Sequence, residues 1–207
     1  MKPNILFSSY YFAPIEYYYQ LTQYNAIYKD FHEHFIKQTY RNRCYILSPN
    51  GIQHLTIPLV NVQKKKATKD VKISYEENWQ KIHWKSFEAA YRRSPFFEYY
   101  ENEFYATFNR KEIFLIDFNE KLEEKIRHLI GLHIDIIETE VYTKSNNETD
   151  DYRSILSPKT THSLLTYPDY IQVFSDRHDF KENLSIIDLL FNEGPNSLNY
   201  LKSITKS

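Results

Sequence analysis

The sequence predicts a single α/β domain over residues 1–207, in which helices flank a mixed sheet that carries one long hairpin. Three observations predict this class. The chain opens with an apolar stretch, a loop and a helical pattern, the order in which many α/β domains begin. A hairpin pattern spans Arg43–Leu59, and helical periodicities follow it. The alternative is an α+β domain with the helices of residues 77–109 packed on one side.

The first of these elements is a strand at Asn4–Ser8. An aromatic loop ending at Pro14 leads into a helical pattern at Ile15–Asn25, and Ala26–Phe31 reads as a second strand. The loop holds no glycine, which excludes a dinucleotide-binding fingerprint at this position.

The hairpin is predicted from its turn and its alternation. Cys44–Leu47 forms one strand and Ile52–Leu59 the return strand. Ser48-Pro49-Asn50-Gly51 between them suits a tight turn, with Asn50-Gly51 in the positions of positive φ. Apolar and polar residues alternate in the return strand, which is typical of a half-buried strand.

Helical spacing of apolar residues predicts a helix over Glu77–Arg92. Ser94-Pro95 favours a new helix with Ser94 as its N-cap. Lys111–Asp117 reads as a buried strand or an extended link, after which Asn119 is expected to cap a helix that stops at Gly131.

The last part of the chain is expected to alternate between loop and ordered segments. Four ranges are predicted as a strand, a long loop, a strand and a helix: His133–Val141, Tyr142–Ser163, Tyr170–Phe174 and Ser185–Asn192. Ser185 and Asp188 fit a capping box, which gives Asp188 a local structural role.

Composition excludes several classes of protein. A formal net charge of −1 argues against nucleic-acid binding through bulk electrostatics. Cys44 is the only cysteine, so neither an internal disulfide nor a cysteine-rich zinc site can form. No apolar run reaches membrane-spanning length and no signal-peptide pattern opens the chain, so we expect a cytoplasmic protein.

The polar candidates gather before the hairpin. In an extended chain Arg41 and Arg43 would point the same way and form a fork for a phosphate or carboxylate, with Lys37 beside them. The alternative is a pair of solvated arginines near a sheet edge. Asp30, His32 and His34 would share a face and resemble metal ligands, but a polar rim is favoured and no metal or other cofactor is expected.

Three further features have a structural and a functional reading. His83 lies on the apolar side of its helix, where a histidine is either a hydrogen-bonded core residue or a catalyst. The lysines at 64–66 and Lys69 lie in a segment without apolar period, which is either a solvated loop or a lid over an anion. Cys44 is interpreted as structural.

Several blocks of the chain together resemble the WbqC-like family, found among O-antigen and related surface-polysaccharide gene clusters. They are Trp79, His83, Tyr91, the run Ser94-Pro95-Phe96, YYFAPIEYY at 10–18, KQTYRNR at 37–43, LTIP at 55–58, and YIQVF to NLSIIDLLFNEGP within 170–195. The chain departs from many relatives at Ser8-Ser9, where they carry Gln-Pro.

The resemblance implies an enzyme of surface-glycan assembly that transfers an aminoacyl or acyl group from an activated donor to a nucleotide- or lipid-linked amino sugar. A non-catalytic sugar-phosphate binding or accessory protein of the same pathway is the alternative. On the first reading His83 is the base and Asn42 stabilises the oxyanion. The residues expected to bind substrate are Tyr11, Lys37, Tyr40, Arg41 and Arg43.

Overall fold

Four parallel strands form the central sheet of the computed structural model, which describes residues 4–63, 65–144, 149–159 and 164–206. The strands are β1 (Asn4–Phe7), β2 (Ala26–Lys29), β5 (Asp135–Glu138) and β6 (Thr149–Asp151), in the order β5-β2-β1-β6. Phe7 pairs with Lys29, Lys29 with Glu138 and Leu6 with Asp151, so all four carboxyl ends reach one edge.

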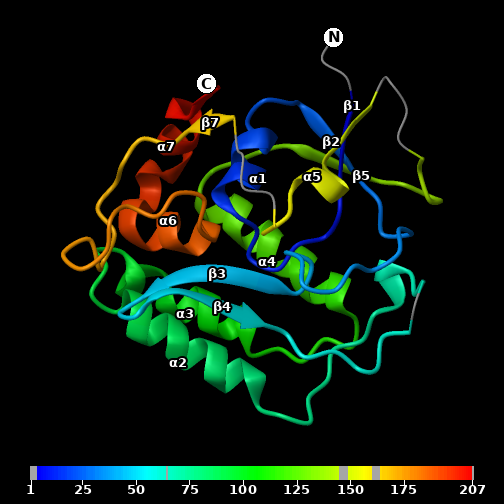
Figure 1. Ribbon diagram of the computed structural model, residues 1–207, viewed down its shortest axis with the longest axis horizontal. Coiled ribbons are helices and arrows are strands. Elements are labelled where there is room, and N and C mark those ends of the chain that lie inside the picture. The colour runs from blue at the N-terminus through cyan, green and yellow to red at the C-terminus, as the bar shows by residue number, and fades with distance from the viewer. Residues whose placement is uncertain (1–3, 64, 145–148, 160–163, 207) are drawn as a thin grey trace.

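The order of the strands creates a reversal beside β1. The chain adds β2 and then β5 on one side of β1, and later places β6 on the other side. In open α/β sheets such a reversal leaves a crevice outside the carboxyl ends of the strands, where ligands bind. The loops that follow β1, β2 and β6 meet at this edge (Figure 1).

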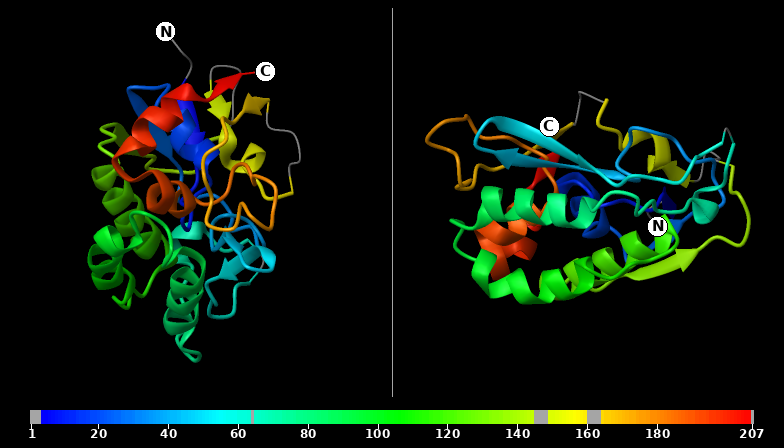
Figure 2. Two further views of the ribbon diagram at one scale, coloured as in Figure 1. Left: turned by 90° about the vertical axis from the view of Figure 1, so that its left-hand side faces the viewer. Right: turned by 90° about the horizontal axis from the view of Figure 1, so that it is seen from below.

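The predicted hairpin is present as β3 (Arg43–Ser48) and β4 (Gly51–Thr56), and Arg43 pairs with Thr56. Among the described residues it forms a two-stranded sheet of its own, so the central sheet is parallel. Gly51 has a φ of 101°, as the turn requires. Asn50 was also predicted to have a positive φ, but it does not. The hairpin runs across the helical layer (Figures 1 and 2).

Helices surround the sheet and the hairpin. They are α1 (Ile15–Leu21), α2 (Trp79–Tyr91), α3 (Phe97–Phe108), α4 (Leu115–Leu129), the single turn α5 (Tyr152–Ile155), α6 (Ile186–Glu193) and α7 (Ser197–Ser203). Thr68–Asp70 and Gly194–Asn196 are 3₁₀ turns, and β7 (Leu165–Thr166) pairs with β8 (Thr205–Lys206). One cluster of buried hydrophobic side chains extends from Ile5 to Ile204.

The α/β class is therefore confirmed, and several local predictions are wrong. Residues 111–114 form the extended link that was one of the two predicted alternatives, with an isolated bridge between Phe114 and Lys72. Helix α4 begins at Leu115, so Asn119 is no cap; its side-chain amide instead donates to the carbonyl oxygen of Arg41 at 2.8 Å. Ser94 does not cap α3, because its hydroxyl donates backwards to the carbonyl of Tyr91. The side chains of Asn119 and Ser94 thus bond backbone carbonyls outside the helix ends that the local pattern predicted them to cap.

The remaining errors concern the C-terminal part. Tyr170–Phe174 forms no strand; the side chains of Tyr170 and Gln172 instead donate to the Asp188 carboxylate at 2.5 and 3.0 Å. No capping box forms, because the Ser185 hydroxyl donates to the carbonyl of Phe12. The predicted loop at 142–163 contains β6 and α5, and its stretches 145–148 and 160–163 lie outside the described residues.

Candidate functional site

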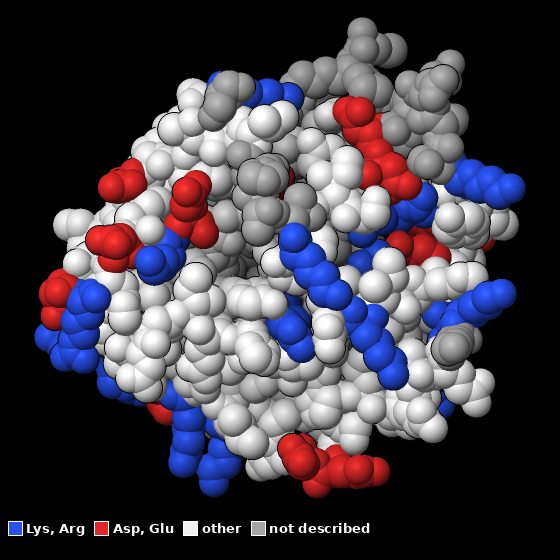
Figure 3. Space-filling view, in the orientation of Figure 1, with Lys and Arg blue, Asp and Glu red and all other residues white. Residues whose placement is uncertain are grey.

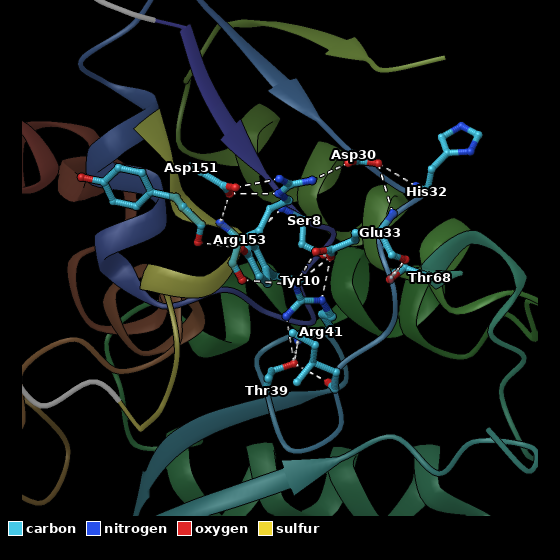
Figure 4. Close-up of polar contacts among 12 residues, drawn as sticks. Ser8, Tyr10, Asp30, His32, Glu33, Thr39, Arg41, Thr68, Asp151 and Arg153 are labelled. Atoms are coloured by element: carbon cyan, nitrogen blue, oxygen red, sulfur yellow. Dashed lines mark hydrogen bonds and ion pairs between the residues drawn. The ribbon is translucent and has the colours of Figure 1, made fainter. Parts of the chain in front are cut away.

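A cavity of about 540 Å³ opens at the carboxyl edge of the sheet, where β1, β2 and β6 end. Its wall comes from the segment after β2, from the turn before the hairpin and from the start of α5. The lining residues are His32, Glu33, His34, Ile36, Arg41, Tyr142, Asp151, Arg153 and Ser154. The floor of this cavity is a network of charged side chains (Figure 4).

One half of the network is the ion pair of Arg41 and Glu33. Nε and Nη2 of Arg41 each donate to the Glu33 carboxylate at 2.7 Å, and Nη2 also donates to the carbonyl oxygen of Arg153 at 3.1 Å. The Ser8 hydroxyl donates to the same carboxylate. Arg41 is only 1% exposed, so its charge is held by protein groups rather than by water.

The other half joins Arg153 to two aspartates. Nη1 of Arg153 donates to Asp30 Oδ2 at 2.5 Å, and Nη2 donates to Asp151 Oδ2 at 2.6 Å. Asp30 also accepts the backbone N–H groups of His32 and Glu33 at 2.8 and 3.2 Å. These bonds fix the first turn of the chain after β2, which forms one wall of the cavity.

Asp151 is the carboxylate most open to the cavity, with 20% of its side chain exposed. Partial burial acts to raise its pKa, but the hydrogen bonds and charge of Arg153 outweigh burial and hold the pKa of Asp151 below its usual range. Asp151 is therefore ionised at neutral pH and can accept a hydrogen bond from a ligand.

The charges of the network do not cancel. It contains three carboxylates, Asp30, Glu33 and Asp151, and two guanidiniums, Arg41 and Arg153. The network therefore carries one excess negative charge. Arg153 serves two aspartates at once. The inner part of the cavity, whose floor is this network of five side chains, therefore favours a cationic group over an anion.

The rim of the cavity is aromatic and apolar. The Tyr142 ring lies 5.2 Å from the guanidinium of Arg153, and both Tyr142 and Ile36 are about half exposed. His32 is partly buried and His34 is exposed. In Figure 4 the imidazole of His32 is directed away from the Asp30 carboxylate. No group of three or more metal-ligating side chains gathers anywhere in the described residues, and Asp30 is engaged with Arg153.

Of the residues predicted to bind substrate, Arg41 lines the cavity, whereas the other four do not. Arg41 lies in a turn, so the expected fork is not formed: Arg43 projects from β3 and donates to the Thr56 hydroxyl at 3.0 Å. Lys37 is exposed and Tyr40 is buried against Tyr45.

The predicted catalytic pair lies in the core. His83 is 4% exposed and its Nδ1 is 2.9 Å from the hydroxyl of Tyr11, the fifth predicted substrate-binding residue. Burial lowers the pKa of His83 to about 4, against a smaller opposing effect of a hydrogen bond with the Thr56 backbone. The Asn42 amide donates to the carbonyl of Ile57 at 2.9 Å. Neither residue lines the cavity, and their catalytic roles stay predictions.

Sequence reasoning missed five residues of the network, namely Ser8, Asp30 in its role as an ion-pair partner, Glu33, Asp151 and Arg153. The available signal was their position: Asp151 is the last residue of β6, and the other four residues follow the end of β1, β2 or β6. Strands were predicted next to Ser8 and Asp30, but the predicted ranges Asn4–Ser8 and Ala26–Phe31 ran past the observed ends at Phe7 and Lys29 and included both residues. Asp151 and Arg153 lie in a stretch that was predicted as loop.

The fold and cavity together define an α/β protein with a charged site at the switch point of a parallel sheet. The family model of the WbqC-like protein family matches residues 8–166, and the chain belongs to this family. The tail at 170–195 lies outside the match. No curated protein and no solved structure matched the chain. Within the described residues no helix is both long and apolar enough to span a bilayer.

Proposed function

We propose that the protein is an enzyme of surface-polysaccharide biosynthesis that transfers an aminoacyl or acyl group to the amine of a nucleotide- or lipid-linked sugar. The family membership supports the pathway, since the WbqC-like family is associated with polysaccharide gene clusters. One observation carries the choice of reaction: the cavity joins an uncompensated carboxylate charge to two imidazoles in one wall.

The charge of the cavity selects the acceptor. A protonated amine entering the cavity meets Asp151, which is ionised and partly exposed. A charge-assisted hydrogen bond from the ammonium to this carboxylate fixes the position of the nitrogen. A neutral sugar hydroxyl gains less from the same carboxylate, and an anionic group is repelled. The cavity therefore discriminates in favour of an amino sugar.

The reaction then needs one proton transfer before the attack. The His32–His34 pair takes a proton from the ammonium, since imidazole is the side chain suited to this transfer near neutral pH. The free amine attacks the carbonyl carbon of the activated donor, the new C–N bond forms and the donor's C–O bond breaks. The proton held by the imidazole passes to the leaving oxygen, and the attacking nitrogen releases its second proton to water as the amide forms. We assign the base to this pair rather than to His83, because His83 faces Tyr11 in the core.

A sugar-phosphate binding or accessory protein remains the second candidate. It is favoured by the mutual pairing of the arginines and carboxylates, because such a network shapes a binding site without taking part in chemistry. The two candidates differ in their need for the imidazoles. A binding protein needs the shape and charge of the cavity only, whereas the enzyme needs a proton acceptor as well.

Gene deletion followed by mass spectrometry of the surface polysaccharide tests the proposal. Deletion should remove one acyl or aminoacyl substituent and leave the sugar backbone intact. A missing sugar residue would instead indicate sugar transfer or precursor synthesis and would refute the reaction.

Complementation with variants separates the two candidates. We expect Asp151→Asn and the double change His32→Ala/His34→Ala to fail to restore the substituent. The control is His133→Ala, which should restore the substituent fully. His133 is exposed and lies just before β5, at the amino end of the strand, whereas the cavity lies at the carboxyl edge of the sheet. If the double histidine variant restores the substituent and Asp151→Asn does not, the binding protein is the correct reading.

A further inference from the structure

Two lysine-bearing turns flank the wall of the cavity that carries His32 and His34. One contains Lys37, directly after Ile36 of the cavity wall. The other contains Lys65 and Lys66 and continues to Lys69. The sequence left the second segment open between a solvated loop and a lid over an anion.

The second segment is attached to the cavity wall by backbone hydrogen bonds. Phe35 N–H donates to the carbonyl of Lys66, Thr68 N–H to that of Glu33 and Lys69 N–H to that of Phe31, each at 2.9 Å. The buried Thr68 hydroxyl also donates to the Glu33 carbonyl. These bonds hold the lysine segment alongside residues 31–35, so its position relative to the mouth of the cavity is fixed by the fold.

The lysines of both turns are available to a ligand. Lys37, Lys65 and Lys69 are exposed and Lys66 is partly exposed, and none forms an ion pair with a carboxylate in the described part of the chain. Asp70 is the one acidic neighbour on the segment, which leaves a net positive charge there. Figure 3 shows Lys and Arg side chains across the middle and right of the face that Figure 1 presents.

The backbone of the two turns is unusual in the same way. Gln38, beside Lys37, has a φ of 61°, and Lys65 has a φ of 62°. Residues other than glycine adopt this region uncommonly, and such conformations concentrate at ligand clamps. Each turn thus presents a lysine next to a left-handed residue, at the edge of a cavity whose interior carries one excess negative charge.

We infer that these lysines bind the diphosphate of the substrate at the mouth of the cavity, while its amine reaches Asp151 inside. The inference rests on the proposed function for the identity of the amine, and it names the substrate as a diphosphate-linked amino sugar. A basic mouth and an acidic interior fit a ligand with the opposite polarity along its length. Lysine is suited to this contact because it binds phosphate as a point charge without a fixed fork.

Binding of inorganic pyrophosphate to the full chain tests the inference without any transfer reaction. The test variant is Lys65→Gln/Lys66→Gln/Lys69→Gln, and calorimetry at low ionic strength measures the dissociation constant. We expect binding about tenfold weaker or more, since three exposed charge contacts are lost together. Binding by the wild type should also weaken as salt rises, because exposed charges are screened.

The matched control changes three lysines of helices far from the cavity along the chain, Lys81→Gln/Lys85→Gln/Lys202→Gln, so that the net charge of the two variants is equal. This control should bind pyrophosphate as the wild type does. Equal weakening in both variants, or no binding by the wild type, would overturn the inference. Asp151→Asn should keep pyrophosphate binding, so failure of the proposed reaction and failure of the diphosphate site give different results.

Competition then distinguishes the two sources of a diphosphate. Uridine diphosphate and geranyl diphosphate are each added against pyrophosphate. The half-exposed side chains of Ile36 and Tyr142 at the cavity rim would add apolar contacts for a prenyl chain. Tighter competition by geranyl diphosphate assigns the site to a lipid-linked sugar, and tighter competition by uridine diphosphate assigns it to a nucleotide sugar. Failure of both to compete would overturn the inference.

Discussion

Replacing Arg41 by alanine should destabilise the fold far more than replacing Arg43, although the two are only two positions apart in the sequence. Arg41 is 1% exposed and makes two 2.7 Å hydrogen bonds to Glu33 and one of 3.1 Å to the carbonyl of Arg153. Its removal leaves the Glu33 carboxylate buried with the Ser8 hydroxyl as its nearest donor. Breaking a buried pair in this way costs about 3–5 kcal/mol.

The expected loss corresponds to a fall in melting temperature of roughly 6–20 °C for a chain of this size. Urea and thermal unfolding of the purified variants measure it. Arg43→Ala is the control and should cost below about 1 kcal/mol, because Arg43 is half-buried and bonds only the Thr56 hydroxyl. Changing both partners, Arg41→Met/Glu33→Met, should recover most of the loss. An Arg41→Ala variant as stable as Arg43→Ala would refute the reasoning.

Two buried groups should give opposite dependences of stability on pH. The pKa of His83 is lowered from 6.5 to about 4, so the stability that its neutral form contributes is full above pH 6.5 and is lost as the pH falls towards 4. The pKa of Asp188 is raised from 3.8 to about 6, so the stability that its protonated form contributes is lost as the pH rises from 3.8 to 6. Each effect amounts to about 3 kcal/mol. Urea unfolding across pH 4–7 should show that His83→Gln removes the first loss and Asp188→Asn the second; unchanged profiles would contradict the assignments. The protein should need no metal, which metal analysis of the purified chain measures. One tightly bound zinc per chain that is lost in His32→Ala would contradict this prediction.

The sequence predicted those elements whose hydrophobic pattern is strong. The first strand is a short continuous apolar run that is buried on both faces. The hairpin and helix α2 carry apolar residues at the period of their structure, and burial of that face determines the element. Strand β6 has only three residues, is polar, and ends with Asp151. Its place at the sheet edge is set by pairing with β1 rather than by its own composition, so no local pattern predicts it.

The site was harder to predict because its partners are distant in the chain. Asp30 and Arg153 are separated by 123 positions, and their ion pair exists only because β2 and β6 end at the same edge. Arg41 and Arg43 do not form the expected anion-binding fork, for a related reason. Glu33 competes for the Arg41 guanidinium, and a bidentate bond to a buried carboxylate fixes the arginine in a turn.

The Arg41–Glu33 pair also determines which way a substrate must enter. A phosphate that reached Arg41 would have to displace Glu33, and separating that buried pair costs several kcal/mol. It would also meet the uncompensated charge of Asp151. In the proposed binding mode the anion of the substrate therefore stays at the mouth, where the lysines have no carboxylate partner among the described residues. In that mode the amine enters first and reaches Asp151, so the pairing inside the cavity sets the orientation of the substrate in the proposed reaction.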